Sequence, residues 1–246
     1  KDINTPEDNF ITISMMCGTH PDGQDISGEA DWMQGNGIGE VAQDLVIRAF
    51  GRHDITLHID DGCKGGGGSL GKHDSKFIDS VESALYANNN YGSGSNTGFD
   101  KSSRSGIFHY CVFADKNKDG SSTSTGFGQY GGDFFVIFDG TFRGSSNQAN
   151  TFMHEMGHNT LGAYIEFSDS SWSGVDPETY RSWHNPLLSH FKTGHPTGHD
   201  LDGDGKNDVY DHSPSKSDTM YYITTRDTID YKSETWAAID LVECFN

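Results

Sequence analysis

Two histidines and a glutamate lie close together in the middle of the chain, in the run His-Glu-Met-Gly-His. His154 and His158 are four positions apart, so on an α-helix they project from one face about a turn apart. Two neutral imidazoles in this arrangement can bind one divalent cation. Glu155 stands beside the first histidine, where a carboxylate can take a proton from a water molecule at the metal. The pattern predicts a catalytic zinc helix, and its alternative is a surface helix whose histidines have other partners.

The residues around this pair favour the zinc helix. The surrounding run, residues 149–161, carries four apolar side chains next to the histidines: Phe152, Met153, Met156 and Leu161. Gly157 would leave room beside the metal. Catalytic zinc usually has three protein ligands and one open position, so one more ligand is required elsewhere in the chain.

At this point the sequence resembles the metzincins, zinc peptidases with the pattern HExxHxxGxxH and a later methionine turn beneath the metal. The first pattern is incomplete, because its glycine and third histidine are replaced by Leu161 and Tyr164, and Gly162 comes one position late. The methionine turn is present in residues 217–222, SDTMYY, with Met220 as the expected floor of the site. Residues 230–241 are similar to the segment that leads into the last helix of pappalysin-like and archaeal relatives.

The archaeal branch of that family, the archaemetzincins, suggests the third ligand. Its third histidine and methionine stand eight positions apart, as do His212 and Met220. Ser213 and Asp218 replace that branch's cysteines, so its second zinc site is not implied here. The resemblance therefore implies that residues 163–211 are an insertion and that His212 is the third zinc ligand.

Other residues compete with His212 for this role. Glu166 would give the two-histidine, one-glutamate set of thermolysin, although eight residues after His158 is close for a ligand from a later helix. The other candidates for the third ligand also lie in the insertion and have side chains that can bind metals: His184, His190, His195, His199 and Asp169.

A calcium loop is predicted at the end of the insertion. Residues 200–211, DLDGDGKNDVYD, follow the oxygen-ligand spacing of an EF-hand-like loop. The expected ligands are Asp200, Asp202, Asp204, the backbone carbonyl of Lys206, Asp208 and Asp211. This calcium would order the insertion that delivers His212. A shorter repeat of the pattern, Asp115, Asn117 and Asp119, is a second calcium candidate, with an ordinary turn as the alternative.

Composition sets limits on partners and location. Against 36 Asp and Glu there are 17 Lys and Arg, a net charge of -19, and no basic run, which argues against a nucleic-acid partner. No stretch approaches the roughly twenty apolar residues of a membrane span. The four cysteines, Cys17, Cys63, Cys111 and Cys244, have no zinc-ribbon spacing, so two disulfides and an extracytoplasmic location are predicted; four buried free thiols are the alternative. Because the chain starts at Lys1 without a signal-like run, a processed form is expected.

The elements that must position these residues are expected to form one α+β catalytic domain, with a sheet and zinc helix in residues 1–162 and the calcium loop, methionine turn and last helix in 163–246. Strands are predicted at residues 10–16, 54–59, 106–114 and 133–139, and helices at 38–50, 74–87, 149–161 and 233–244. Residues 88–105 are predicted as a loop, with a short helix within 172–183. The first two strands should be parallel, because a helix connects them. Ser145, Ser146 and Asn147 are candidate caps of the zinc helix, and Ser233 of the last.

Taken with the resemblance, these features imply a metzincin-like fold: a twisted mixed sheet with backing helices, an active-site helix, a methionine turn and a C-terminal helix. The implied activity is that of a secreted zinc endopeptidase with Zn²⁺ and Ca²⁺ and a protein or peptide substrate. Glu155 would be the general base, and Tyr222 would support the oxyanion. The alternative is that Tyr222, which stands next to Tyr221, only packs beneath the turn. The strand at 133–139 would be the sheet edge to which a peptide adds, and the alternative is that its apolar run belongs to the core. The alternatives are a calcium-stabilised surface module with a vestigial zinc site and a zinc hydrolase of a non-peptide amide.

Overall fold

The computed structural model describes residues 24–33, 35–62, 67–70, 99–104, 106–114, 125–138, 144–166, 181, 183–192, 200, 207–221 and 229–239. The described strands are β1 (Gln24–Trp32), β2 (Ile55–Asp60), β3 (Phe108–Ala114), β4 (Gly126–Gly128), β5 (Phe134–Phe138), β6 (Tyr164–Ile165) and β7 (Val209–Tyr210). The described helices are α2 (Glu40–Gly51), α4 (Lys101–Arg104), α5 (Ser145–Leu161), the 3₁₀ helix η2 (Pro186–Lys192) and α7 (Ser233–Trp236).

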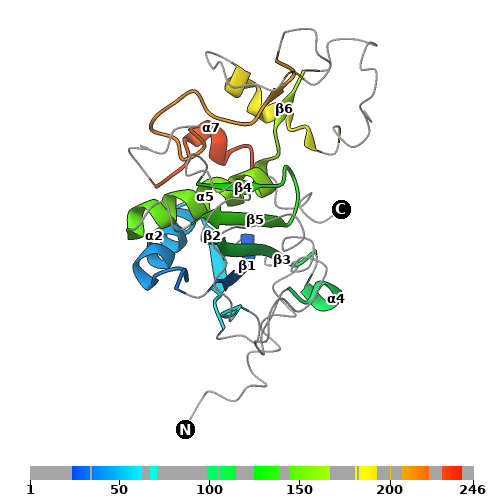
Figure 1. Ribbon diagram of the computed structural model, residues 1–246. Coiled ribbons are helices and arrows are strands. Elements are labelled where there is room, and N and C mark those ends of the chain that lie inside the picture. The colour runs from blue at the N-terminus through cyan, green and yellow to red at the C-terminus, as the bar shows by residue number, and fades with distance from the viewer. Residues whose placement is uncertain are drawn as a thin grey trace.

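Five strands form one mixed sheet in the order β2-β1-β3-β5-β4 (Figure 1). Four of them are parallel, and β4 runs antiparallel to β5 at the edge. Strands β3 and β5 are buried along their whole length, as expected for parallel strands covered on both faces. The mixed sheet with several helices is compatible with the predicted α+β class. The prediction that residues 133–139 form the sheet edge is wrong, because β4 lies outside β5.

The first crossover of the sheet joins β1 to β2 through α2, and these two strands are parallel in the register Gln24↔Ile55 to Glu29↔Asp60. The predicted helix at 38–50 and strand at 54–59 are therefore present with slightly shifted ends. The strand that precedes the helix, however, is β1, which the sequence analysis did not predict. The predicted strand at residues 10–16 lies outside the described residues.

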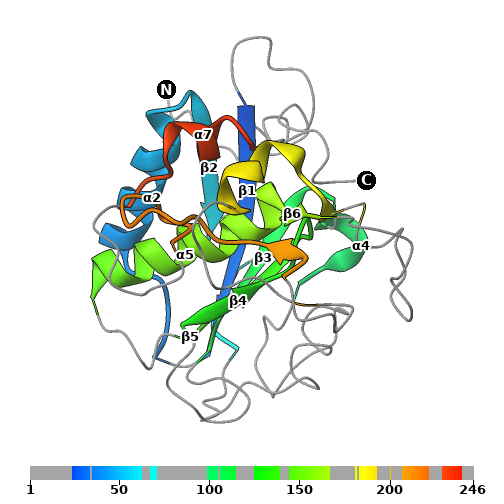
Figure 2. The ribbon, with the colours of Figure 1, turned by 90° about the horizontal axis from the view of Figure 1, so that it is seen from above.

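The two faces of the sheet bury separate clusters of apolar side chains. One cluster joins the sheet to α2 and α5, which lie side by side over the same face (Figure 2). In β3 it takes Cys111 and Phe113, whereas Tyr110 and Val112 point into the cluster on the opposite face with Leu70 and Phe99. The alternation fixes which face of each strand supports α5, the helix with the paired histidines.

A short helix interrupts the region predicted as a loop. Helix α4 occupies Lys101–Arg104 within residues 88–105, so that loop prediction is wrong at its end. The guanidinium Nη1 of Arg104 lies 2.7 Å from Oε2 of Glu29 and 3.0 Å from Oδ2 of Asp60. It thereby compensates two buried carboxylates, one on β1 and one at the end of β2. The predicted helix at 74–87 lies outside the described residues.

The C-terminal elements pack together above α5 (Figure 1). Strands β6 and β7 form a two-stranded antiparallel sheet, and α7 contacts η2. The last helix is described as helical over Ser233–Trp236, and residues 240–246 lie outside the description. Its cap is Lys232, not Ser233, and the cap of α5 is Gly144, not Ser145, Ser146 or Asn147; neither cap has a side-chain hydrogen bond. The short helix predicted within 172–183 falls largely outside the described residues.

Two further predictions, on disulfides and on membrane spans, concern residues that the structure describes in part. Cys111 is a free, buried thiol in β3, whereas Cys17, Cys63 and Cys244 lie outside the description, so the disulfides stay a prediction. None of the described helices combines the length and the apolar composition needed to cross a membrane.

Candidate metal centre

Helix α5 carries the paired histidines and is buried from Ala149 to Leu161. The ring centroids of His154 and His158 are 4.9 Å apart, so the two imidazoles share one face of the helix as their spacing predicts. Both side chains are nearly inaccessible to solvent, and Glu155 between them is only 3% exposed. A buried carboxylate therefore lies beside two buried imidazoles.

His212 completes a group of three histidines. Its ring centroid lies 5.1 Å from that of His154 and 5.1 Å from that of His158. One ligand atom from each of the three lies within 4.8 Å of the others, close enough to hold a metal ion, and the described residues contain no second group of this kind. The side chain of His212 is 20% exposed, so the group is open to solvent on this side.

The segment between α5 and His212 returns to the helix because its two ends pair with each other. Helix α5 ends at Leu161, and Gly162 turns the chain with a φ of 67°, where a Cβ would lie 2.4 Å from the backbone oxygen of Trp183. The chain then enters β6, which pairs with β7 in the register Tyr164↔Tyr210 and Ile165↔Val209. Strand β7 ends two residues before His212, so the β6–β7 pairing returns the chain to the end of α5.

Hydrogen bonds set the orientation of two of the three rings. Nδ1 of His154 lies 2.8 Å from the backbone oxygen of Thr219, and Nδ1 of His212 lies 2.7 Å from Oδ1 of Asp211. A carbonyl or carboxylate oxygen accepts only, so each Nδ1 must carry the proton and donate. The Nε2 atoms then keep their lone pairs, which is the form that binds a metal.

The predicted methionine turn lies directly against α5. A Cβ added to Gly157 would lie 2.3 Å from Sδ of Met220, so this glycine makes room for the methionine rather than for the metal. The backbone N–H of Ser213 donates to the oxygen of Met220 at 3.0 Å. Asp218, which is fully buried, accepts from the N–H of Met220 and from the hydroxyl of Thr235 on α7. The turn is thus attached to the third histidine's segment and to the last helix.

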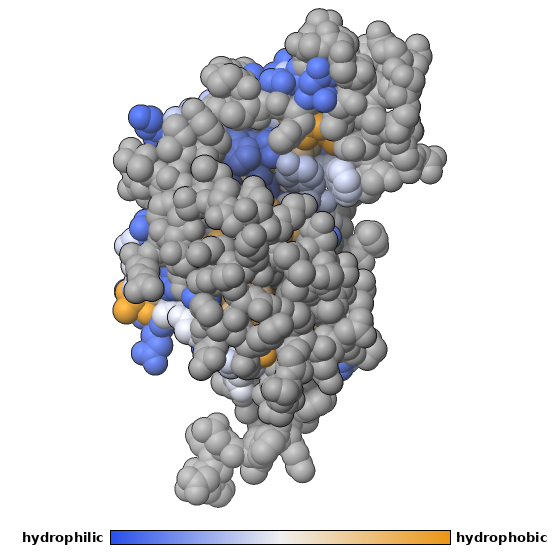
Figure 3. Space-filling view, in the orientation of Figure 1, coloured by the Kyte–Doolittle hydropathy of each residue, from blue (hydrophilic) through white to orange (hydrophobic). Residues whose placement is uncertain are grey.

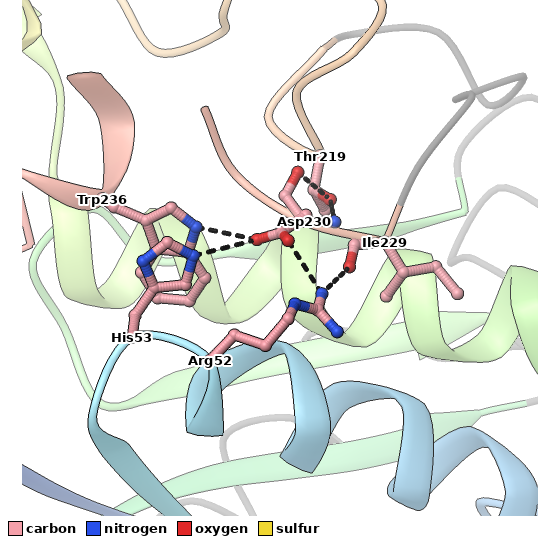
Figure 4. Close-up of polar contacts among 6 residues, drawn as sticks. All are labelled: Arg52, His53, Thr219, Ile229, Asp230 and Trp236. Carbon is pink, nitrogen blue, oxygen red and sulfur yellow. Dashed lines mark hydrogen bonds and ion pairs between the residues drawn. The ribbon is translucent and has the colours of Figure 1, made fainter. Parts of the chain in front are cut away.

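Asp230 supports the same turn from the other side (Figure 4). Its carboxylate accepts from Nη2 of Arg52 and from Nε1 of Trp236, both at 2.7 Å. Its backbone oxygen accepts from the N–H and the hydroxyl of Thr219, each at 2.9 Å. The end of α2, the methionine turn and α7 therefore meet at one residue, Asp230, which is two hydrogen bonds away from His154.

Tyr130 and Asp211 form a contact that sequence reasoning missed. The hydroxyl of Tyr130, in the β4–β5 connection, donates to Oδ2 of Asp211 at 2.5 Å, and its ring packs edge-on against His158 at 5.5 Å. Burial, followed by the Asp211 carboxylate, raises the pKa of Tyr130 far above its usual value, so the phenol stays protonated and donates. No spacing rule links Tyr130 to the histidines. Thr219, the hydrogen-bond partner of His154, does have a signal in the sequence, because it stands directly before Met220.

The alternative third ligands that the structure describes are used elsewhere. Glu166 forms a 2.6 Å ion pair with Lys192. Nδ1 of His184 accepts the backbone N–H of Ile165 at 3.0 Å, and burial lowers the pKa of His184, which favours the neutral accepting form. His190 lies beside Leu187 and Thr235. His195, His199 and Asp169 lie outside the described residues.

Most of the predicted calcium ligands also lie outside the description, namely Asp202, Asp204, Lys206, Asp115, Asn117 and Asp119. Of the others, Asp208 and Asp211 are buried. Both carboxylate oxygens of Asp211 accept hydrogen bonds from protein groups, and its role as a calcium ligand stays a prediction. The calcium loop stays a prediction, as does the role of Tyr222, which is not described.

The arrangement could hold a metal ion. Its three imidazole nitrogens are the number of protein ligands that leaves one position of a four-coordinate metal open. In the space-filling view, hydrophilic residues line the recess between α5 and the part of the molecule that carries β6 (Figure 3).

Comparison of the chain with protein-family models, with curated proteins and with solved structures found no match in any of the three. The resemblance to metzincins therefore depends on the motifs, and membership of that family stays a prediction.

Proposed function

We propose that this chain is a zinc-dependent endopeptidase of metzincin type that acts outside the cytoplasm. The observation that carries the proposal is the convergence of His154, His158 and His212 from two distant segments, with Glu155 buried beside them. Three nitrogen donors favour zinc over calcium or magnesium, which prefer oxygen. A binding module would have no need of the carboxylate.

The chain's own residues have separable roles in this proposal. A zinc ion held by the three imidazoles would supply Lewis acidity toward a carbonyl and a water. Glu155 accepts the proton of the attacking water and then donates it to the departing amine. Thr219 and Asp211 hold two of the rings in the required tautomer. Met220 supports the site from below.

The sheet edge offers a place for an extended peptide. Phe138 donates to the oxygen of Thr125 and Gln129 donates to the oxygen of Phe134, so odd-numbered residues of this segment bond to β5. The backbone groups of Gly128 therefore point toward the opposite edge. A Cβ at Gly126 would lie 2.9 Å from Cδ of Glu155, so a peptide added along β4 would pass close to the proposed general base.

The experiment compares zinc content and casein cleavage in the parent and in Glu155→Gln and His212→Ala, in buffer containing calcium. Glu155→Gln should keep zinc and lower kcat by about 10²–10⁴-fold, because it removes only the general base. His212→Ala should lose zinc and activity. Glu166→Gln is the matched glutamate control and His190→Ala the matched histidine control, and both should behave like the parent.

Three results would contradict the proposal in different ways. Retention of zinc by His212→Ala with its loss in Glu166→Gln would give the third-ligand role to Glu166. Zinc binding without casein cleavage, but with hydrolysis of a small amide, would favour the non-peptide hydrolase. Absence of both zinc and cleavage in the parent would favour a calcium-stabilised surface module.

A further inference from the structure

We propose that Asp211, itself held by the hydroxyl of Tyr130, positions His212 and makes this ligand as well oriented as the two on α5. The inference extends the proposed function and rests on its metal site. Its residues are not metal ligands in this proposal: they act through His212.

His212 lies between two short backbone contacts, the β6–β7 ladder before it and the hydrogen bond from the N–H of Ser213 to the oxygen of Met220 after it. His154 and His158 lie on a buried helix of 17 residues. His212 follows β7, a strand of two residues that pairs only with the two residues of β6. A loop residue on so short a ladder keeps a fixed side-chain orientation only if its own polar atoms are bound. In the structure that partner is Asp211, 2.7 Å from Nδ1 of His212.

Asp211 is in turn fixed from the opposite side of the site. It is 2% exposed, and its second oxygen accepts the hydroxyl of Tyr130 at 2.5 Å across 81 positions of sequence. One oxygen therefore faces the ligand and the other faces a donor on the sheet side. Rotation of the carboxylate would break one hydrogen bond, so the two donors together define its plane.

Tyr130 is a suitable anchor because the β4–β5 connection is attached to α5. The N–H of Gly131 donates to the backbone oxygen of His158 at 2.9 Å, and Nδ2 of Asn159 donates to the oxygen of Gln129 at 2.8 Å. The residues on both sides of Tyr130 are thus bonded to the helix at its second histidine. The ring of Tyr130 also packs against His158, so one side chain relates the positions of His158 and His212.

The consequence is a prediction about metal binding that does not depend on turnover. Zinc affinity, measured by competition with a chromophoric chelator, should fall about 10–100-fold in Asp211→Asn, the usual effect of losing a carboxylate that orients a ligand. Tyr130→Phe keeps the ring but loses the hydroxyl, and should weaken zinc by about fivefold, the size of one typical hydrogen bond. If Tyr130 acts through Asp211, the double variant should be no weaker than Asp211→Asn alone.

Two control variants make the same chemical changes elsewhere. Asp25→Asn alters a carboxylate 3.5 Å from Nε2 of His58, far from the site in sequence. Tyr110→Phe removes a hydroxyl that donates to an aspartate, Asp31, at 2.8 Å in the cluster on the opposite face of the sheet. Both should bind zinc as the parent does. The visible spectrum of the cobalt(II)-substituted protein should change in Asp211→Asn but not in the controls, because a changed ring orientation alters the ligand field whereas a general loss of stability does not.

The outcomes separate this inference from the peptidase proposal. If Asp211→Asn has the same zinc affinity and cobalt spectrum as Asp25→Asn, the role of Asp211 is overturned, whatever the activity of the parent. Additive losses in the double variant would overturn the link through Tyr130. If the parent binds zinc but cleaves no peptide, the proposed function is overturned, and the zinc affinities of the Asp211 and Tyr130 variants still decide the inference. If the parent binds no zinc, both the proposed function and the inference are overturned.

Discussion

Gly157, between the two helix histidines, shows how one missing side chain shapes the site. An alanine there would place Cβ 2.3 Å from Sδ of Met220 and 2.9 Å from Oη of Tyr231. Gly157→Ala should therefore lower the free energy of unfolding by about 1–3 kcal/mol, as overpacking of a core does, although alanine is the better helix former. Zinc affinity should fall as well, because Met220 must move. Denaturant unfolding of the metal-free protein and zinc competition measure the two effects.

The control for this substitution is Gly51→Ala at the end of α2, where a Cβ would meet nothing within 4 Å. That variant should be as stable as the parent or slightly more stable. Equal stability changes at Gly51 and Gly157 would contradict the account of Met220.

At this scale the sequence allowed some residues of the site to be predicted and concealed others. The pairing of His154 and His158 could be anticipated from residue type and spacing, and His212 from the resemblance to archaemetzincins. Tyr130 and Asp230 could not, since they act through contacts that only the folded chain creates. The spacing of the acidic residues predicted Asp211 as a calcium ligand, but its hydrogen bonds to His212 and Tyr130 could not be read from that spacing.

Among the elements, β4 lies unusually close to α5. A Cβ at Gly128 would be 2.4 Å from the backbone oxygen of Glu155, and backbone cannot move aside as a flexible side chain can. Gly128→Ala should lower the free energy of unfolding by about 1–3 kcal/mol, which corresponds to roughly 2–4 °C in Tm per kcal/mol for a chain of this size. Thermal unfolding of the metal-free protein tests this.

A strand glycine with more space provides the comparison. At Gly28 in β1 the nearest atom to an added Cβ, Cε of Met156, is 3.6 Å away, an ordinary contact. Gly28→Ala should leave Tm unchanged or raise it slightly. A Gly128→Ala variant as stable as Gly28→Ala would show that β4 does not lie against α5 in solution.

Element prediction succeeded where hydrophobic pattern and local propensity agreed. Strands β3 and β5 are runs of apolar residues, and α2 has a clear helical stripe. Strand β1 was missed although it is central in the sheet, because its sequence QDISGEADW is rich in small and acidic residues. Its acids are tolerated only through distant partners, such as Arg104 for Glu29 and Tyr110 for Asp31.

In the whole molecule, which carries a net charge of -19, His212 follows a long segment, residues 163–211. The β6–β7 pairing joins the two ends of this segment, and Asp211 and His212 come directly after β7. The predicted calcium loop ends at Asp211. If calcium orders residues 200–211, it also reduces the freedom of the segment that aims His212, so the two metals should be coupled.

We therefore expect zinc to bind about 5–150-fold more tightly in millimolar calcium than in calcium-free buffer, the usual range of coupling between two sites. Coupling is reciprocal, so zinc should raise calcium affinity by the same factor. Magnesium at equal concentration controls for ionic strength, and Asp204→Asn should abolish the calcium effect without changing zinc affinity in its absence. Zinc affinity that does not change with calcium in the parent would contradict the coupling between the 200–211 loop and His212.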